Sequence, residues 1–315
     1  MTAEISTSRR AEGFRPSVSA VVPTRDRPAL LLRALEAIRR QRYGGEIECI
    51  VVFDQAEEAI LPLDTVPHMT IRTISNTRSP GLAGARNTGI LAAHGDLVAF
   101  CDDDDEWLPN KLAVQTDLMR STAAVTVSSG ICIRHGRQEH ARVPPADAIT
   151  FRDLLRSRRM ELHPSTIVVD REALLSRIGL IDEAIPGSYA EDYEWLLRAA
   201  RLQPIAAVCA PLTRVHWHES SFFAARWEVI VSALTYLLER YPEFASERAG
   251  LARICGQLAF ASAGCDRPSD ALRWAGRALR LSPFQPRAYL ALAVSLGIAT
   301  PDQVLRLARV FGRGI

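Results

Sequence analysis

The chain has 315 residues, 48% of them hydrophobic, and its 38 Lys and Arg nearly balance its 36 Asp and Glu, which leaves a formal net charge of +2. This near-neutral charge excludes a protein that binds mainly through non-specific contacts with nucleic-acid phosphates, so no nucleic-acid partner is expected. The length allows one large domain, or one domain with a smaller appendage.

The N-terminus and the cysteines indicate the compartment. Residues 1–16 are polar and lack the apolar stretch of a signal peptide, so we expect a flexible N-terminus. The six cysteines form no CxxC pair and mostly lie in apolar runs, which favours a reducing compartment over disulfides or a zinc site. No stretch is long and apolar enough to span a bilayer. We therefore expect a cytoplasmic protein, with peripheral membrane contact left open.

Strand and helix patterns alternate over the first 120 residues. Near-continuous apolar runs predict buried strands at 17–22, 47–53, 69–74 and 96–101, and apolar residues at helical spacing predict helices at 29–41, 81–94 and 108–119. This alternation predicts an α/β fold with a mostly parallel, Rossmann-like sheet flanked by helices. Ligands of such sheets bind beyond the carboxyl ends of the strands, so the loops after Val22, Phe53 and Cys101 are expected to share one crevice.

The later part of the chain changes from mixed to helical. Strands are predicted at 165–169, 204–209 and 213–220, and helices at 171–178 and 190–201. After residue 221 the pattern is almost wholly helical, with Pro and Gly breaks between the helices. Two of these helices resemble a single tetratricopeptide-type repeat, which is too few for a solenoid, so a helical cap is preferred.

Four consecutive aspartates, in the sequence FCDDDDEW, follow the predicted strand at 96–101. In an extended segment the side chains of Asp102 and Asp104 point to the same side, as do those of Asp103 and Asp105. Hard divalent cations take carboxylate oxygens as ligands, and Mg²⁺ typically uses one or two carboxylates together with substrate phosphates. The run therefore indicates a cation site, and a solvated loop is the alternative.

The segment SPGLAGARNTGILAAHGDLVAFCDDDDEWLPNKL resembles the core of family 2 glycosyltransferases, which have the GT-A fold. VSAVVPTRDRP resembles the first strand and nucleotide-binding loop of that family. The resemblance implies a GT-A domain at 17–225, with a nucleotide-binding half at 17–120 and an acceptor half at 121–225. A C-terminal helical region would occupy 226–315.

The resemblance implies that Mn²⁺ or Mg²⁺ bridges the two phosphates of a nucleotide-sugar, most often a UDP-sugar in the family. By position Asp104 is the best metal ligand, while Asp102 and Asp103 are candidates for metal or ribose contact. The fourth aspartate, Asp105, leaves the register open by one residue.

Other nucleotide contacts are implied by position. Asp54 takes the place of the aspartate that hydrogen-bonds the base, although VVFDQAEE lacks the Gly-Ser that commonly follows it, and a turn residue is the alternative. Arg86 matches a basic residue near the nucleotide, with a structural salt bridge as the alternative. Pro23 and Thr24, with Arg25 after them, supply the loop against the nucleoside.

The segment YAEDYEWLLR resembles the Glu-Asp motif of the family. Asp192 matches the general base that takes the proton of the acceptor nucleophile, and Glu191 is expected to orient the acceptor. Acidic residues that favour a helix N-terminus are the alternative explanation of this pair.

Three histidines are candidates near the metal or acceptor. TRVHWHESS resembles the Arg-x-His segment that lies near the cation, so His216 is a candidate metal ligand and His218 is its alternative. His163 is a weaker candidate for the acceptor side.

The expected function is an inverting glycosyltransferase that moves a sugar from a nucleotide-sugar to an acceptor by single displacement. A nucleotidyltransferase that forms nucleotide-sugars is an alternative, but PTRDRP lacks the glycines of its phosphate loop. A non-catalytic binding module is a second alternative. The acceptor is expected to be a glycan, a lipid-linked sugar or a small metabolite, and the helical tail allows a homo-oligomer.

Overall fold

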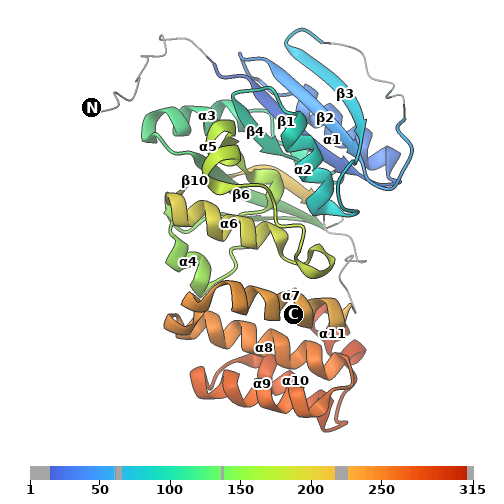
Figure 1. Ribbon diagram of the computed structural model, residues 1–315, viewed down its shortest axis with the longest axis vertical. Coiled ribbons are helices and arrows are strands. Elements are labelled where there is room, and N and C mark those ends of the chain that lie inside the picture. Colours follow the sequence, from blue (N-terminus) through green and yellow to red (C-terminus); the bar gives the residue numbers. More distant parts are fainter. Residues whose placement is uncertain (1–14, 60, 62–65, 136–137, 217–225, 311–315) are drawn as a thin grey trace.

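The computed structural model describes residues 15–59, 61, 66–135, 138–216 and 226–310. A central sheet has helices on both faces, and a layer of C-terminal helices lies against one end of this α/β part (Figure 1). The predicted α/β class with a C-terminal helical region is confirmed.

The first half of the sheet is parallel, as predicted. Its strands run in the order β3-β2-β1-β4. They are β1 (Val18–Thr24), β2 (Ile47–Phe53), β3 (Met69–Ser75) and β4 (Leu97–Phe100), with helices α1 (Pro28–Arg39), α2 (Leu82–Ala92) and α3 (Lys111–Thr122). Every residue of β1 and β4 is buried, which explains their uninterrupted apolar sequence. The carboxyl ends of β1, β2 and β4 meet at one edge.

The second half makes the sheet mixed, because antiparallel pairs join β4 to β9 and β9 to β6. Strand β6 is parallel to β10, while β5, β7 and β8 pair antiparallel. The strands are β5 (Glu106–Trp107), β6 (Thr126–His135), β7 (Gln138–Arg142), β8 (Ala148–Ile149), β9 (Val168–Asp170) and β10 (Ile205–His216). The two strands predicted at 204–209 and 213–220 are one strand up to His216, with register shifts on both sides of Pro211. Proline cannot donate to the ladder, which accounts for the break in the pattern.

Short helices connect the second half and lead to the long helix α6. The α-helices are α4 (Phe151–Arg156), α5 (Arg171–Ala173) and α6 (Glu191–Leu202). The remaining turns are the 3₁₀ helices η1 (Pro164–Thr166) and η3 (Pro186–Ser188) and the π-helix η2 (Leu174–Ile178). The helix predicted at 171–178 is therefore α5 continued by η2, and most of the strand predicted at 165–169 is η1 followed by β9.

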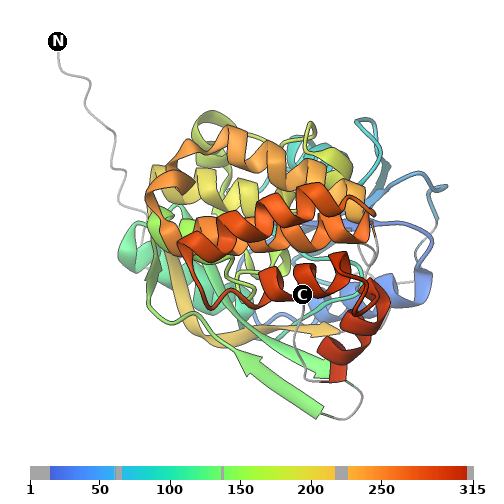
Figure 2. The ribbon, with the colours of Figure 1, turned by 90° about the horizontal axis from the view of Figure 1, so that it is seen from below.

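The C-terminal helices pack against α4 and α6 rather than standing apart. They are α7 (Trp227–Arg240), η4 (Pro242–Ser246), α8 (Arg248–Gly264), α9 (Pro268–Leu281), α10 (Pro286–Ser295) and α11 (Pro301–Val310). Seen from below in Figure 2, they lie in front of the α/β part. The Tyr241 hydroxyl donates to Glu194 of α6 over 2.7 Å, and both side chains are buried. Within the described ranges, no helix has the length and apolar character needed to cross a membrane.

Helix α2 approaches β1 so closely that only glycine fits at one position. A Cβ at Gly89 would lie 2.3 Å from Val21 Cγ1. Gly89→Ala is therefore expected to lower the free energy of unfolding by about 1–3 kcal/mol, as overpacking does elsewhere. Gly276 of α9 is the matched control, because a Cβ there would meet nothing within 4 Å. Gly276→Ala should raise stability by about 0.5–1 kcal/mol. Urea denaturation of both variants checks this, and an unchanged Gly89→Ala protein would contradict it.

Candidate active site

The aspartate run begins where β4 ends, at the carboxyl edge of the sheet. Its first side chain, Asp102, accepts a hydrogen bond from Arg86 over 2.6 Å. Arg86 lies on α2, is 2% exposed and also donates to Glu191 of α6 over 2.6 Å. The buried guanidinium therefore links the aspartate run to the Glu-Asp motif, although these segments are far apart in the sequence.

Burial and pairing act against each other in this chain of ions. Burial disfavours the charge of Asp102, but Arg86 outweighs it and lowers the pKa of the carboxyl. At Glu191 burial prevails over Arg86 and raises the pKa to about 7. Removing one partner of a buried ion pair is costly, so Arg86 stabilises the positions of Asp102 and Glu191.

The next two aspartates face the loop after β1. Asp103 accepts from the Thr24 hydroxyl over 2.7 Å and from Arg27 over 3.2 Å. Arg27 also donates to Asp104 over 3.1 Å. Burial and then the three neighbouring aspartates raise the pKa of Asp104 to about 7. The attraction of Arg27 therefore does not offset the repulsion that the neighbouring carboxylates exert on Asp104.

The fourth aspartate completes a group that could hold a metal ion. Ligand atoms of Asp102, Asp105 and His163 all lie within 4.8 Å of one another. His163 Nδ1 is 3.2 Å from Asp105 Oδ2, and the Ser165 hydroxyl donates to the same carboxylate over 2.6 Å. The other oxygen of Asp105 is buried and has no hydrogen-bond partner among the described residues. Burial opposes the charge of His163, but Asp105 and Asp102 raise its pKa to about 9.

The Glu-Asp motif lies at the N-terminus of α6. Asp192 receives two hydrogen bonds from Arg158, over 2.9 and 3.1 Å, and its side chain is 17% exposed. Burial opposes ionisation, but Arg158 lowers the pKa of Asp192 and so keeps the carboxylate charged. Asp192 can thus accept a proton, whereas the more deeply buried Glu191 is held by Arg86.

Asp54 is occupied by contacts within the protein. Its carboxylate accepts from the Gly81 amide over 3.0 Å and from the Asn76 side chain over 2.8 Å. These bonds fix the loop that precedes α2. Phe53, one residue earlier, lines the nearby pocket instead of Asp54.

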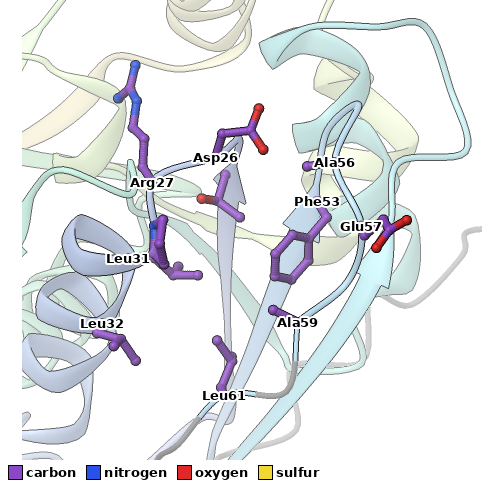
Figure 3. A pocket seen from close by; sticks show the side chains of 11 residues that line it. Asp26, Arg27, Leu31, Leu32, Phe53, Ala56, Glu57, Ala59 and Leu61 are labelled. Atoms are coloured by element: carbon purple, nitrogen blue, oxygen red, sulfur yellow. The ribbon is translucent and has the colours of Figure 1, made fainter.

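A pocket of about 200 Å³ adjoins the aspartate run. In Figure 3 the Phe53 ring faces it from the end of β2, while Leu31 and Leu32 of α1 lie on the other side. Thr24, which donates to Asp103, is part of its wall. The pocket therefore combines an apolar interior with a direct connection to the carboxylates.

The remaining predicted residues fall around this edge. Pro23 is buried at the end of β1, and the Arg25 side chain after it is 53% exposed. His216 Nε2 lies 2.5 Å from Glu106, which Arg33 also contacts at 3.2 Å. This contact places His216 outside the group formed by His163 and the two aspartates. The alternative residue, at position 218, lies outside the described residues.

Two contact residues at the site were not predicted from the sequence. Arg27 belongs to the PTRDRP loop but was not singled out, and Arg158 belongs to none of the motifs identified in the sequence. Nothing in the local sequence of Arg158 shows that it reaches Asp192, 34 residues further on.

Solved structures share this fold. The chain superimposes on S. aureus TarS 1-349 in complex with UDP-GlcNAc with a TM-score of 0.59 and 17% identity, covering 94% of this chain and 92% of that one. It superimposes on the mannosyltransferase PcManGT from Pyrobaculum calidifontis, in complex with GDP-Man and Mn²⁺, with a TM-score of 0.56 and 20% identity, covering 90% and 87%. The architecture is that of the GT-A glycosyltransferases.

The family follows from the sequence comparison. The model described as "Glycosyl transferase family 2" matches residues 19–177, just over half of the chain, and the chain belongs to this family.

Curated relatives match over part of their length. The Escherichia coli K12 protein described as "Putative colanic acid biosynthesis glycosyl transferase WcaA" is 34% identical over 31% of this chain and 36% of its own. The Escherichia coli β-1,3-glucosyltransferase WfgD is 24% identical over 61% of this chain and 72% of its own. The chain thus spans about a third of WcaA.

Proposed function

We propose that the protein is an inverting glycosyltransferase that moves a sugar from a nucleotide-sugar to an acceptor nucleophile with the help of a divalent cation. The observation that carries the proposal is the buried ion chain Asp102–Arg86–Glu191. It joins carboxylates suited to a metal-bound diphosphate to Glu191, the residue before Asp192, and Asp192 is a charged carboxylate suited to act as base. A single displacement needs these two functions on opposite sides of one anomeric carbon.

The donor would lie along the carboxyl edge of the sheet. The pocket beside Phe53 and Leu31 would hold the nucleoside, with the Phe53 ring as a surface for the base. The diphosphate would then lie near Asp103 and Asp104, since Thr24 connects the pocket to them. UDP-sugars are the first donors to test. The solved complexes of TarS with UDP-GlcNAc and of PcManGT with GDP-Man support a nucleotide-sugar in general.

The residues present fit a divalent cation. Asp102, Asp105 and His163 offer two carboxylates and an imidazole within reach of one ion, and Asp104 is the ligand expected from the sequence. Mn²⁺ accepts this mixed set, and the PcManGT complex contains Mn²⁺. When bound, the ion would offset the charge that develops on the departing nucleoside diphosphate. The chain's own residues bind and orient the donor, and Asp192 takes the proton of the acceptor.

Metal affinity should depend on pH, because ligands must lose their protons. The pKa of Asp104 is raised to about 7, so this carboxyl carries a proton below neutrality in the metal-free protein. If Asp104 is a ligand, the apparent affinity for Mn²⁺ should fall about tenfold per pH unit below pH 7. Titration with Mn²⁺ across this range checks it. An affinity that stays constant down to pH 5 in the wild-type protein would remove Asp104 from the ligand set.

The proposed reaction is tested by release of nucleoside diphosphate. The full chain is incubated with UDP-, GDP- and dTDP-sugars, with Mn²⁺ or with a chelator, and free nucleoside diphosphate is measured. Slow metal-dependent release from one class of donor is expected even without acceptor, because water can replace it. The acceptor is proposed to be a saccharide. WfgD is described as acting on GlcNAc-diphosphoundecaprenol, so a lipid-linked saccharide is the first acceptor to add. Release from no donor, with or without candidate acceptors, would contradict the proposal.

We propose the domain limits 17–225 for the transferase part and 226–315 for the helical region. Peripheral contact with a membrane would follow from a lipid-linked acceptor, and sedimentation of the full chain with vesicles tests it.

A further inference from the structure

Two arginines from separate segments lie against the tyrosines beside the proposed base, and a third arginine lies near them. The guanidinium carbon of Arg158 lies 5.9 Å from the ring centre of Tyr193 and 6.0 Å from that of Tyr189. The corresponding carbon of Arg253, on α8, lies 5.6 Å from the Tyr193 ring. Arg287, on α10, is close enough to Arg253 for their charges to interact. Two of the three arginines therefore come from the C-terminal helical region.

Arg158 and Arg253 differ in how their charges are balanced. Arg158 is paired with Asp192. Arg253 instead donates to neutral oxygens, those of the Tyr193 hydroxyl at 3.1 Å and the Gln257 side chain at 3.2 Å. Its Nε is buried and has no hydrogen-bond partner among the described residues. Within those ranges no carboxylate lies within 4.0 Å of the Arg253 guanidinium.

Burial and mutual repulsion both work against these cations. Burial and then the charge of Arg158 lower the pKa of Arg253, and burial and then Arg253 lower the pKa of Arg287. Cations held together in a partly buried position cost stability unless an anion joins them. Their placement is therefore better explained by a ligand than by the packing of α8 and α10.

We propose that Arg253 and Arg287, with Arg158, bind a phosphate or diphosphate group carried by the acceptor substrate. Guanidinium groups match phosphate oxygens with paired hydrogen bonds, which favours phosphate over a neutral sugar. The inference rests on the proposed function, because only the role of Asp192 assigns this side of the site to the acceptor.

The position of the group fits such an acceptor. Arg158 contacts Asp192 directly, and Tyr193 follows Asp192 in α6. A phosphate held at Arg253 would thus lie a short distance from the hydroxyl that gives its proton to Asp192. A sugar whose own anomeric oxygen carries the phosphate meets this requirement. The C-terminal helices then form part of the acceptor site.

Calorimetric titration of the full chain with inorganic pyrophosphate tests the site, in the presence of a chelator so that no metal-bound diphosphate forms at the aspartates. Saturable binding by the wild-type protein is expected. Arg253→Gln and Arg287→Gln should each weaken it about tenfold or more, the loss expected for one hydrogen bond to a charged group. Arg273→Gln is the matched control, because Arg273 is an exposed arginine of α9 that pairs with Asp270. It should leave the affinity unchanged.

Two further measurements separate binding from folding and identify the source of the phosphate. Arg253→Lys keeps the charge and should retain more affinity than Arg253→Gln, whereas a purely structural role would give equal losses. Thermal unfolding of each variant verifies that it is folded. Farnesyl diphosphate is titrated in parallel. Tighter binding than that of pyrophosphate supports a lipid-linked acceptor, and equal affinity supports recognition of the phosphates alone.

The inference is overturned if wild-type protein does not bind either probe, or if folded Arg253→Gln and Arg287→Gln proteins bind them as the wild type does. Its failure is distinct from that of the proposed function. If only this inference fails, wild-type protein still releases nucleoside diphosphate from the donor in a metal-dependent way. If the proposed function fails, wild-type protein shows no such release.

Discussion

Asp192→Asn is expected to lower kcat for sugar transfer by about 10²–10⁴-fold, the usual contribution of a general base. Asparagine has nearly the same shape but cannot take the proton of the acceptor. The affinity for the nucleotide-sugar should stay within about twofold, because Asp192 contacts Arg158 and not the aspartate run. Steady-state kinetics and a separate donor titration check the two statements.

Glu191→Gln separates the two carboxylates of the motif. Glu191 pairs with the buried Arg86, so its substitution is expected to lower thermal stability and to reduce kcat less than Asp192→Asn does. If Asp192→Asn retained wild-type turnover, Asp192 would not be the base. Loss of turnover in a folded Glu191→Gln protein would then move the assignment to Glu191.

Removal of the divalent cation is expected to lower activity by about 10³-fold or more, because such an ion contributes several kcal/mol to transition-state stabilisation. Asp104→Asn should have a similar effect if the ligands are those expected from the sequence. His163→Gln should instead cause this loss of activity if the metal ligands are Asp102, Asp105 and His163. Activity across a Mn²⁺ titration distinguishes the two sets. Asp117→Asn, a partly exposed aspartate of α3, is the control.

Asp104→Asn should also make the metal-free protein more stable. The pKa of Asp104 is raised from 3.8 to about 7, so the folded state binds this proton more tightly than the unfolded chain. Stability therefore falls as the pH rises from 3.8 to 7, and the cost of the charged carboxyl is complete above pH 7. Asparagine removes that cost, with an expected gain of about 1–3 kcal/mol at pH 8. Equal stability of both proteins at pH 8 would show that the aspartates do not repel one another there.

Local patterns were sufficient for the parallel half of the sheet. The apolar sequences of β1 and β4 are fully buried, and this is why they could be placed from the sequence. Strand β6 of the mixed half was not predicted, because Thr126, Ser128, Ser129 and Gly130 interrupt its apolar pattern. Pro211 similarly divides β10 into two apparent strands.

The structure brings the predicted site segments together at one edge of the sheet, but the contacts between them depend on tertiary structure. The motif identified Asp102 and Glu191, yet only the fold shows that one arginine, Arg86, joins them. The arginines Arg158 and Arg253 come from segments without a motif and meet at Tyr193. The register among the aspartates remained open for the same reason, since Asp105 reaches His163 through the turn after β4. The role of each residue remains a prediction for the experiments above.

Metal-dependent binding of a nucleotide-sugar tests the central claim most directly. Thermal shift of the wild-type protein is measured with UDP-, GDP- and dTDP-sugars, each with Mn²⁺ and with a chelator. The proposed reaction predicts that one class of nucleotide-sugar raises the Tm clearly when Mn²⁺ is present and little or not at all without it. No rise with any nucleotide-sugar in the presence of Mn²⁺, or an equal rise with chelator, would contradict the proposed function.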